Sequence, residues 1–327
     1  MNINLPTVKM RGRYKIQIRD AAGIVHTETD WFDNLITNTG LDWYGSGVSD
    51  YAIGSAFWAP LFRCAVGTNN TPPTNTDTTL GAQIATQPPY SVGGGSPPVS
   101  SPTYVAGPPA YFTASIVYTF ALGAVIGNIA EIGVGCFPVA GGAPTSGTKL
   151  TLFSHALIQS GGSPTTISVT GADQLIVTFE LRYYINTTDT PYSVIISGIT
   201  YTGTMRSLNQ NIGTGFSLGG TIDNTSSQSN TTSCQVYNGS LGTVTSPPSG
   251  SSVNIGSAPI PAYTGGTYTK SYTFSANTSS GNLSGGITAL VVQSSFQCWQ
   301  FSLSPTLPKD NTKTMTLTFS YSWARYP

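Results

Sequence analysis

The chain has 327 residues, which is long enough for two domains that each bury a core without metal ions or disulfides. Only 8% of the residues are charged, against roughly 25% in ordinary soluble domains, while 39% are hydrophobic and the formal net charge is zero. This composition excludes an intrinsically disordered chain, provides no field that attracts nucleic acid, and favours a subunit packed in an assembly over a free monomer.

The first predicted element is a β-hairpin near the N-terminus. Residues 14–19 alternate apolar and polar side chains, residues 20–23 form a turn, and residues 24–28 return as the partner strand. Basic side chains alternate with neutral ones here, and acidic ones follow closely; the basic residues are Lys9, Arg11, Arg13, Lys15 and Arg19, and the acidic residues are Asp20, Glu28, Asp30 and Asp33. This pattern favours a solvated face of a hairpin over nucleic-acid binding.

The segment that follows the hairpin combines turn-forming and apolar residues. Asparagines beside Gly40 satisfy exposed backbone groups in turns, apolar side chains hold such a turn down, and a short helix is expected to begin near Thr39. The candidate docking residues are Asn34, Leu35, Ile36, Asn38, Leu41 and Trp43. They suit a contact with a neighbouring subunit and, equally well, a plain corner of the domain.

Two polar stretches come next in the chain. Residues 64–84 predict a strand end, a loop that contains prolines, and a short helical turn through Leu80 with Asp77 as its cap. Residues 87–109 are rich in Pro, Gly and Ser, which predicts a long surface loop or arm, and residues 246–262 have the same character in the second half.

The two halves of the chain contain similar motifs in the same order. Tyr118-Thr119-Phe120 and Gly127-Asn128-Ile129 match Tyr272-Thr273-Phe274 and Gly281-Asn282-Leu283. An apolar strand follows each pair, and each half ends in a strand of period two, at residues 174–184 and 314–323. We therefore expect an all-β fold of two tandem antiparallel β-sandwich domains, jelly-roll-like and with short helical turns, that arose by internal duplication.

The boundary between these domains is expected near residue 190. Residues 186–191 (NTTDTP) have the composition of a linker, and residues 192–201 then alternate as one further strand. The expected domains are residues 1–190 and residues 191–327. Residues 116–139 are apolar, but Asn128, Glu131 and several glycines interrupt them, which favours two buried strands and a turn over a membrane helix.

Four segments, in order, carry a resemblance to a known class of proteins. They are FDNLITNTGLDWYG (residues 32–45), VGTNNTPPTNTDTTLG (66–81), GNIAEIGVG (127–135) and LIVTFELRYY (175–184). Together they resemble accessory structural proteins of tailed-bacteriophage virions, over roughly residues 10–185. The resemblance implies a non-enzymatic virion component, placed either at the neck, tail or fibre or on the head as a decoration (cement) protein. It implies capsid, portal, neck or tail subunits as partners and a homo-oligomer in the particle.

This interpretation predicts docking through the first domain and an exposed second domain. The stretch from residue 207 to residue 308 contains only Asp223 and Lys270 as charged residues, which suits an exposed or partner-covered surface. The N-terminus MNINLPTVKM has no apolar run behind its basic residues, so we expect synthesis in the host bacterial cytoplasm without a signal peptide.

The main alternative is a module that binds a host receptor or a carbohydrate. Aromatic side chains in loops suit stacking on sugars, although Trp and Tyr in β proteins more often pack cores or interfaces. The candidate stacking residues are Tyr44, Trp58, Tyr263 and Tyr268, with Trp43 and Tyr51 as further possibilities.

An enzyme is the least favoured alternative. A glycosidase needs two carboxylates around one bond, and the glutamates of the chain are Glu28, Glu131 and Glu180. Glu180 suits a surface ion pair with Arg182, and Glu131 suits a pair with Arg63 or Arg182 or an outward position better than a catalytic role. Neither His26 nor His155 lies in a nucleophile motif.

A metal site or cofactor is not expected either. The cysteines form no CxxC pair that would bind zinc, and their pairing by disulfides stays open; they are Cys64, Cys136, Cys234 and Cys298. Cys136 and Cys298 lie in apolar strand contexts and are expected to behave as small buried hydrophobic residues.

Overall fold

Strands make up almost all of the regular structure, as the period-two patterns predict. The computed structural model describes residues 2–43, 63–88, 103–137, 148–208, 233–258, 261–293 and 298–327. Strands account for 57% and helix for 2%, with no helix of seven or more residues in these ranges. The expected all-β class is therefore confirmed. A helical segment begins at residue 38, next to the position expected for it, and is described to residue 43.

The largest sheet runs through the whole molecule. Its path is β1 (Asn2–Asn4), β24 (Met315–Arg325), β2 (Val8–Asp20), β16 (Asp173–Tyr184), β9 (Tyr111–Thr119) and β8 (Thr103–Val105). β21 (Thr269–Ala276) pairs with β24, and β3 (Val25–Glu28) and β4 (Phe32–Asp33) pair with β2.

Two further sheets and two small ladders complete the described strands. The five-stranded sheet has the order β5 (Leu35–Ile36), β12 (Thr151–Leu157), β11 (Glu131–Cys136), β6 (Arg63–Gly67) and β7 (Gln83–Gln87). The six-stranded sheet has the order β17 (Thr190–Ile196), β18 (Ile199–Ser207), β23 (Cys298–Leu307), β22 (Ile287–Gln293), β19 (Ser233–Tyr237) and β20 (Ser252–Ser257). The ladders are β10 (Gly127–Ile129) with β15 (Ile167–Val169), and β13 (Gln159–Ser160) with β14 (Ser163–Pro164).

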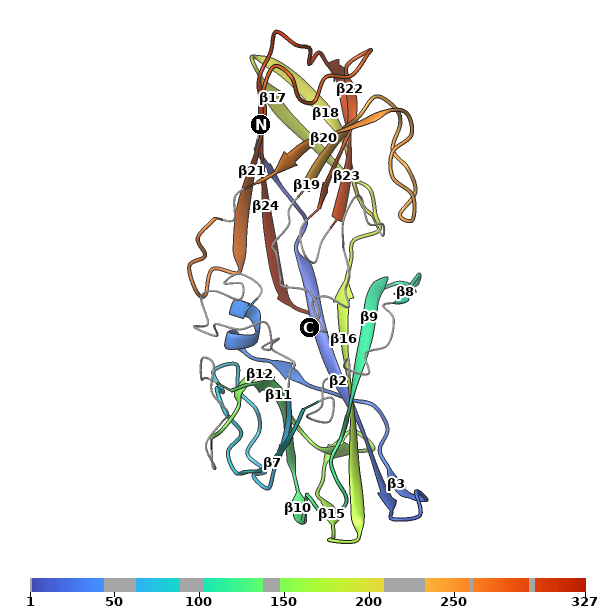
Figure 1. Ribbon diagram of the computed structural model, residues 1–327, viewed down its shortest axis with the longest axis vertical. Helices are drawn as coiled ribbons and strands as arrows, with labels where there is room; N and C mark the ends of the chain where they lie inside the picture. The colour runs from blue at the N-terminus through green and yellow to red at the C-terminus, as the bar shows by residue number, and fades with distance from the viewer. Residues whose placement is uncertain are drawn as a thin grey trace.

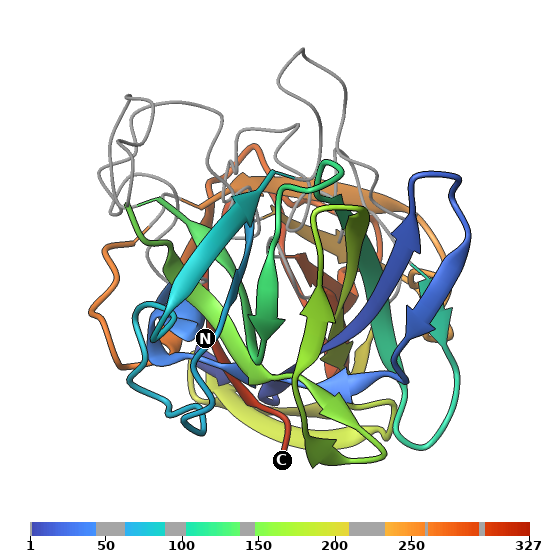
Figure 2. The same cartoon turned by 90° about the horizontal axis from the view of Figure 1, so that it is seen from below.

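One hydrophobic core joins β2, β16 and β9 to the five-stranded sheet, and we call this part the first unit. Alternate residues of these strands point into the core because side chains of a strand alternate between its two faces. The ring of Tyr14 lies 5.2 Å from that of Phe179, and Phe153 of the opposite sheet lies 6.4 Å from Phe179. Aromatic rings thus connect the two layers, which Figure 2 shows along the long axis of the molecule.

A second core lies between β24, β21 and β1 on one side and the six-stranded sheet on the other, and we call this part the second unit. Phe319 of β24 packs 5.4 Å from Phe301 of β23 and 6.1 Å from Phe274 of β21. The chain is elongated, with this unit at one end and the first unit at the other (Figure 1).

Strands from both ends of the chain cross between the units. β1 pairs in parallel with β24 and places Ile3 in the second core, whereas the beginning of β2 pairs in parallel with the end of β24. Trp323, near the end of β24, belongs to the first core. Residues 185–189 do separate β16 from β17, next to the expected boundary, but residues of each expected domain pack in the core of the other.

The two units have the same order of strand pairing. β5-β12-β11-β6-β7 and β16-β9 in the first unit correspond to β18-β23-β22-β19-β20 and β24-β21 in the second. Each of these ladders is antiparallel. Cys64 pairs with Val134 and Cys234 with Val292, so the two cysteines occupy equivalent positions.

Three local expectations were wrong. Residues 192–201 form a hairpin rather than one strand, because Ser197 and Gly198 adopt φ of 51° and 81° and reverse the chain. Residues 246–262 contain β20 and residues 87–109 contain β8, instead of a continuous loop in each case, and residues 89–102 lie outside the described residues. Asp77 caps no helical turn after it; its carboxylate instead accepts the amide hydrogen of Thr74 before it, at 2.8 Å.

Candidate functional site

The predicted docking segment lies at the junction of the two units, where it binds the end of β24. The indole Nε1 of Trp323 donates to the carbonyl oxygen of Leu41 at 2.7 Å. The guanidinium of Arg325 donates to the carbonyl oxygen of Ile36 and, at 2.6 Å, to Oδ1 of Asn38. These bonds join residues separated by more than 280 positions, so the segment holds the second unit against the first.

Residues 263–268 complete this junction. The hydroxyl of Tyr263 and the amide of Gly266 both donate to Oδ1 of Asp42, at 2.7 and 2.6 Å. The Tyr263 ring lies 5.8 Å from that of Trp323, whose amide donates to the carbonyl oxygen of Tyr268. Burial and the adjacent carboxylate of Asp42 raise the pKa of Tyr263, so its hydroxyl remains a donor across the ordinary pH range.

Apart from Asn38 in the junction and Leu35, which is half-buried on β5, the sequence-predicted residues divide into three groups. Ile36, Leu41 and Trp43 are buried in the first core, and Tyr263 and Tyr268 are half-buried against the same core instead of lying open as sugar platforms. Asn34 forms a corner: its Nδ2 donates to Oγ of Ser154 at 3.0 Å. Tyr44, Tyr51 and Trp58 lie outside the described residues. A contact between residues 34–43 and a neighbouring subunit stays a prediction.

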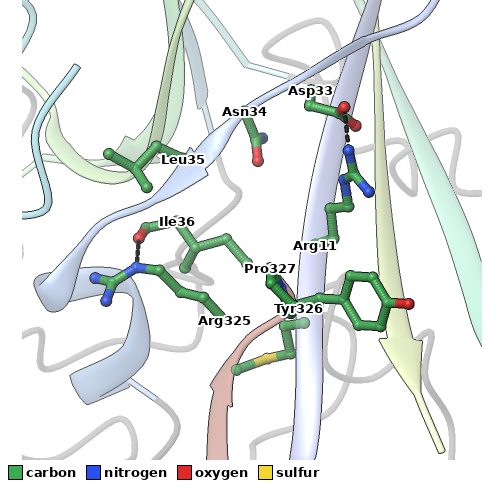
Figure 3. A pocket seen from close by; sticks show the side chains of 9 residues that line it. Arg11, Asp33, Asn34, Leu35, Ile36, Arg325, Tyr326 and Pro327 are labelled. Atoms are coloured by element: carbon green, nitrogen blue, oxygen red, sulfur yellow. Dashed lines mark hydrogen bonds and ion pairs between the residues drawn. The ribbon is translucent and has the colours of Figure 1, made fainter.

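A small cavity opens beside this junction (Figure 3). Its volume is about 160 Å³, and its lining comprises Met10, Arg11, Asp33, Asn34, Leu35, Ile36, Arg325, Tyr326 and Pro327. Arg11 and Asp33 form an ion pair at its rim. Ligand pockets usually measure about 300–1,000 Å³, so this cavity suits a single side chain of a partner better than a small-molecule substrate.

A buried polar cluster underlies the loop of residues 68–82. His155 on β12 bonds Oδ2 of Asp77 through Nδ1 at 2.7 Å and Oε2 of Glu131 through Nε2 at 3.1 Å. Glu131 also accepts the amide hydrogens of Gly81 and Ala82, at 3.0 and 2.7 Å. The expected pairing of Glu131 with Arg63 or Arg182 was therefore wrong, because neighbouring strands and the loop supply its partners instead.

We call Asp77, Glu131 and His155 the ionic clamp, because their hydrogen bonds connect the loop of residues 68–82 to β11 and β12. Burial alone lowers the pKa of His155, but its hydrogen bonds to Glu131 and Asp77 outweigh burial and raise that pKa. Burial raises the pKa of Glu131, but the His155 and amide hydrogen bonds outweigh it and lower that pKa. An imidazolium between two carboxylates is thus the favoured state. Both ring nitrogens are occupied, so His155 has no free nitrogen with which to act as a base.

The other ionisable groups also have structural partners. Oε1 of Glu180 accepts hydrogen bonds from Nε of Arg182 at 2.6 Å and from Nε of Arg13 at 2.7 Å. The expected Glu180–Arg182 ion pair is therefore confirmed. Burial raises the pKa of all four thiols, that of Cys136 to about 11, and all four are free cysteines. Within the described ranges, no cluster of His, Cys, Asp or Glu is arranged to hold a metal ion.

The outward face of β9, β16 and β2 carries a second constellation, which we call the arginine–aromatic face. It consists of Lys9, Arg11, Arg13, Lys15, Arg19, Trp31, Tyr111, Glu180, Arg182 and Tyr184. Arg13 stacks on Trp31 at 4.3 Å, and Arg182 on Tyr111 at 4.5 Å. The alternation of basic residues in β2 predicted one edge of this face. Its contacts with β9 and β16 could not be predicted, because they depend on strand order.

Comparison of the chain with protein-family models, with curated proteins and with solved structures finds no match in any of the three. Among the described residues, no helix has both the length and the apolar character needed to cross a membrane. The functional inference therefore rests on the architecture, the junction and the surface of this chain.

Proposed function

We propose that this protein is a non-enzymatic structural component of a tailed-bacteriophage virion. It attaches through the first unit and exposes the second, either at the neck, tail or fibre or on the capsid as a decoration (cement) protein. The observation that carries the proposal is the crossing of β1, β2 and β24 between the units, which makes an elongated body of two cores (Figure 1). Such a body suits the transmission of load or the bridging of subunits.

The junction supports a structural role because it resists bending. Separate domains that share a small polar interface move relative to one another by default. Here the units share backbone hydrogen bonds along β24, the buried indole of Trp323 and the guanidinium of Arg325. Bending the molecule at this point would require breaking a sheet as well as separating side chains.

We further propose that the units are two β-sandwich domains related by duplication. Their shared pairing order supports this relation, as does a repeated turn. Asp77 accepts the Thr74 amide, and Ser246 accepts the Thr243 amide at 2.9 Å; each turn also brings its two threonine hydroxyls to 3.2 Å. Duplication would produce one unit for attachment and one unit free to diversify.

The low charge fits the same role. Like-charge repulsion keeps free proteins apart in solution, and with 8% charged residues this chain has little of it. The resemblance of four segments of the first unit to accessory virion proteins adds support. The clamp geometry of Asp77, His155 and Glu131 favours stability over catalysis, which supports a non-enzymatic protein.

A second candidate function, binding of a host receptor or carbohydrate, is favoured by one feature of the second unit. A groove of about 480 Å³ lies beside the β17–β18 hairpin, with Ile199 and Lys313 in its lining. That volume falls in the usual range for ligand sites. Ile195 and Ile199 at this hairpin are 67% and 50% exposed. The groove is a better candidate for ligand binding than Tyr263 and Tyr268, which the junction engages.

The test is the copy number of the protein in purified particles of the phage that encodes it. Quantitative mass spectrometry against the major capsid protein gives that number directly. A number comparable with the capsid subunits supports a head decoration protein, and a small multiple of three, six or twelve supports a neck, tail or fibre protein. Absence from particles contradicts the proposal.

A further inference from the structure

We infer that the first unit docks through its arginine–aromatic face onto an acidic protein surface of the particle. This inference rests on the proposed function and adds the surface and the chemistry of the partner. It uses a region that the expected docking residues 34–43 do not include.

Charge is concentrated on this face. Lys9, Arg11, Arg13, Lys15, Arg19 and Arg182 are six of the thirteen basic residues of the chain. Three carboxylates form ion pairs with them in the described structure: those of Asp33, Glu28 and Glu180. The face therefore keeps an excess of positive charge on a chain of zero net charge, which suits carboxylates of a partner.

The strand register concentrates the excess positive charge at one place on this face. Arg11 lies directly across from Arg182, and Lys9 lies across from Tyr184 in the next row. Like charges opposite each other in a sheet are destabilising. Asp33 pairs with Arg11 and Glu180 pairs with Arg182, and each carboxylate reduces the repulsion from one side of the arginine pair. A partner carboxylate above the Arg11–Arg182 pair would relieve the repulsion and could bind either guanidinium in bidentate fashion.

Aromatic rings hold the cationic side chains in place before any partner binds. Trp31, 37% exposed, lies against Arg13, and Tyr111 lies against Arg182. Tyr184 lies 5.4 Å from Tyr111 and stacks on Tyr326 at 3.7 Å. Tyr, Trp and Arg are the residue types that dominate binding energy in protein interfaces, and side chains already fixed lose less entropy on binding.

The same details favour a protein over nucleic acid. A nucleic-acid backbone presents phosphates at regular spacing, and Glu180, Glu28 and Asp33 would repel it at three points among the cations. A protein surface can place its carboxylates over the unpaired cations and avoid these points. Arg and exposed Trp together are also typical of protein interfaces.

The first experiment measures incorporation of charge-reversed protein into particles. Particles produced without the wild-type gene are complemented with K9E/K15E, which reverses two half-exposed or exposed lysines of the face. Because a desolvated charge pair contributes strongly to binding, we expect occupancy to fall about tenfold or more. A matched control, R206E/K313E, makes the same charge change on the second unit and also breaks exposed ion pairs; its occupancy should stay at the wild-type level.

Additional variants make the outcome specific. W31A should lower occupancy without changing charge, and thermal unfolding of each purified variant verifies that it folds. The variant I24S/I126S probes a competing surface, the exposed apolar side chains at the tip of the first unit, and should incorporate normally. Wild-type protein should leave particles as NaCl rises from about 0.15 M to about 0.5 M, because salt screens exposed charges.

Each result decides between distinct conclusions. If wild-type protein is absent from particles, the proposed function and this inference both fail. If the wild type is present and folded K9E/K15E incorporates equally well, the inference alone fails. Loss of incorporation with I24S/I126S but not with K9E/K15E would assign docking to the apolar tip. Duplex DNA that binds the wild type at about 0.15 M NaCl and not K9E/K15E would identify nucleic acid as the ligand of the face.

Discussion

The two units hold equivalent loops with different chemistry. In the first unit, His155 on β12 reaches the loop of residues 68–82 through two carboxylates. In the second, Gln300 on β23 reaches the loop of residues 238–251: its Oε1 accepts the Gly242 amide at 2.9 Å and its Nε2 donates to the Thr243 carbonyl oxygen at 2.6 Å. His155 pairs with Gly133 and Gln300 with Val291, so the two side chains occupy equivalent positions in the pairing order.

The difference extends to the neighbouring strands. Glu131 pairs with Gly67, and at the equivalent place Ala289 pairs with Tyr237. A Cβ on Gly67 would lie 2.4 Å from Oε1 of Glu131, so the glycine provides the room for the carboxylate. In the second unit the small residue stands on the other strand. We call Gln300 and its bonds to Gly242 and Thr243 the neutral clamp. The same strand order thus holds either the ionic or the neutral clamp, and in both units a large residue on one strand pairs with a small residue on the next.

Removing a carboxylate from the ionic clamp should produce the largest effect. Glu131→Ala removes the acceptor of the buried Nε2 of His155 and of the Gly81 and Ala82 amides, and Asp77 still binds Nδ1 of His155. Breaking a buried charge pair by removing one partner costs about 3–5 kcal/mol. We expect the free energy of unfolding in urea to fall by about that amount near pH 6. A decrease below about 1 kcal/mol would show that the clamp contributes little.

Filling the space beside the clamp tests the size compensation. Gly67→Ala places a methyl group against the Glu131 carboxylate and the Ala82 carbonyl oxygen, and overpacking of this kind costs about 1–3 kcal/mol. The matched control is Gly107→Ala, where the backbone has no positive φ and the nearest atom to the added Cβ, the Pro109 carbonyl oxygen, lies 4.0 Å away. Combining Gly67→Ala with Glu131→Ala should cost less than the sum of the single changes, which a double-mutant cycle measures.

The neutral clamp should be weaker. Gln300→Leu keeps the volume but leaves the Gly242 amide and the Thr243 carbonyl without partners, at a cost of about 1–2 kcal/mol. Hydrogen exchange followed by mass spectrometry should show faster exchange in residues 238–251 and no change in residues 68–82. Equally faster hydrogen exchange in both loops would mean that loss of the neutral clamp destabilises both units together.

Sequence patterns predicted the elements that alternate strictly. β2, β16 and β24 each have period two, and Gly23, with a φ of 84°, marks the first hairpin turn as expected. The second hairpin was missed because apolar and polar residues alternate on both sides of its turn, which masked the turn signal of the Ser197-Gly198 dipeptide, where both residues take a positive φ. Local pattern therefore gave the strands but not all of the turns.

Contacts between distant strands could not be predicted. The clamp joins Asp77, Glu131 and His155 from a loop and two strands, and nothing in their spacing indicates that they meet. β1 is equally hidden: three residues give too short a pattern, and their partner lies more than 300 positions away in β24. Candidate sites were therefore assigned to aromatic, apolar and asparagine residues in predicted turns and loops. Of these, Asn38, Leu41 and Tyr263 meet in the structure, where they form the junction between the two units.

Exchanging the central residue of the ionic clamp should change the pH dependence of stability. The pKa of His155 is raised in the folded protein, so its contribution is fully present below its unfolded value of about 6.5 and is lost as pH rises through the folded value. The pKa of Glu131 and that of Asp77 are lowered, so their contributions are present above about pH 4.5 and are lost as pH falls through the folded values. The ionic clamp is therefore strongest between about pH 4.5 and 6.5.

His155→Gln places the residue of the neutral clamp in the first unit and should remove the basic limit of this window. Wild-type stability should decline from about pH 6.5 upward, by at most about 1.4 kcal/mol for each pH unit by which the folded pKa exceeds the unfolded one. The variant should show no such decline between about pH 6 and pH 9, although it is less stable than the wild type at about pH 6. His26→Gln is the control, because His26 is an exposed partner of Asp173 and lies outside the clamp. Identical pH profiles for the wild type and His155→Gln would mean that His155 is neutral in the folded protein. Neutral hydrogen bonds would then hold both loops, and the two clamps would differ only in residue type.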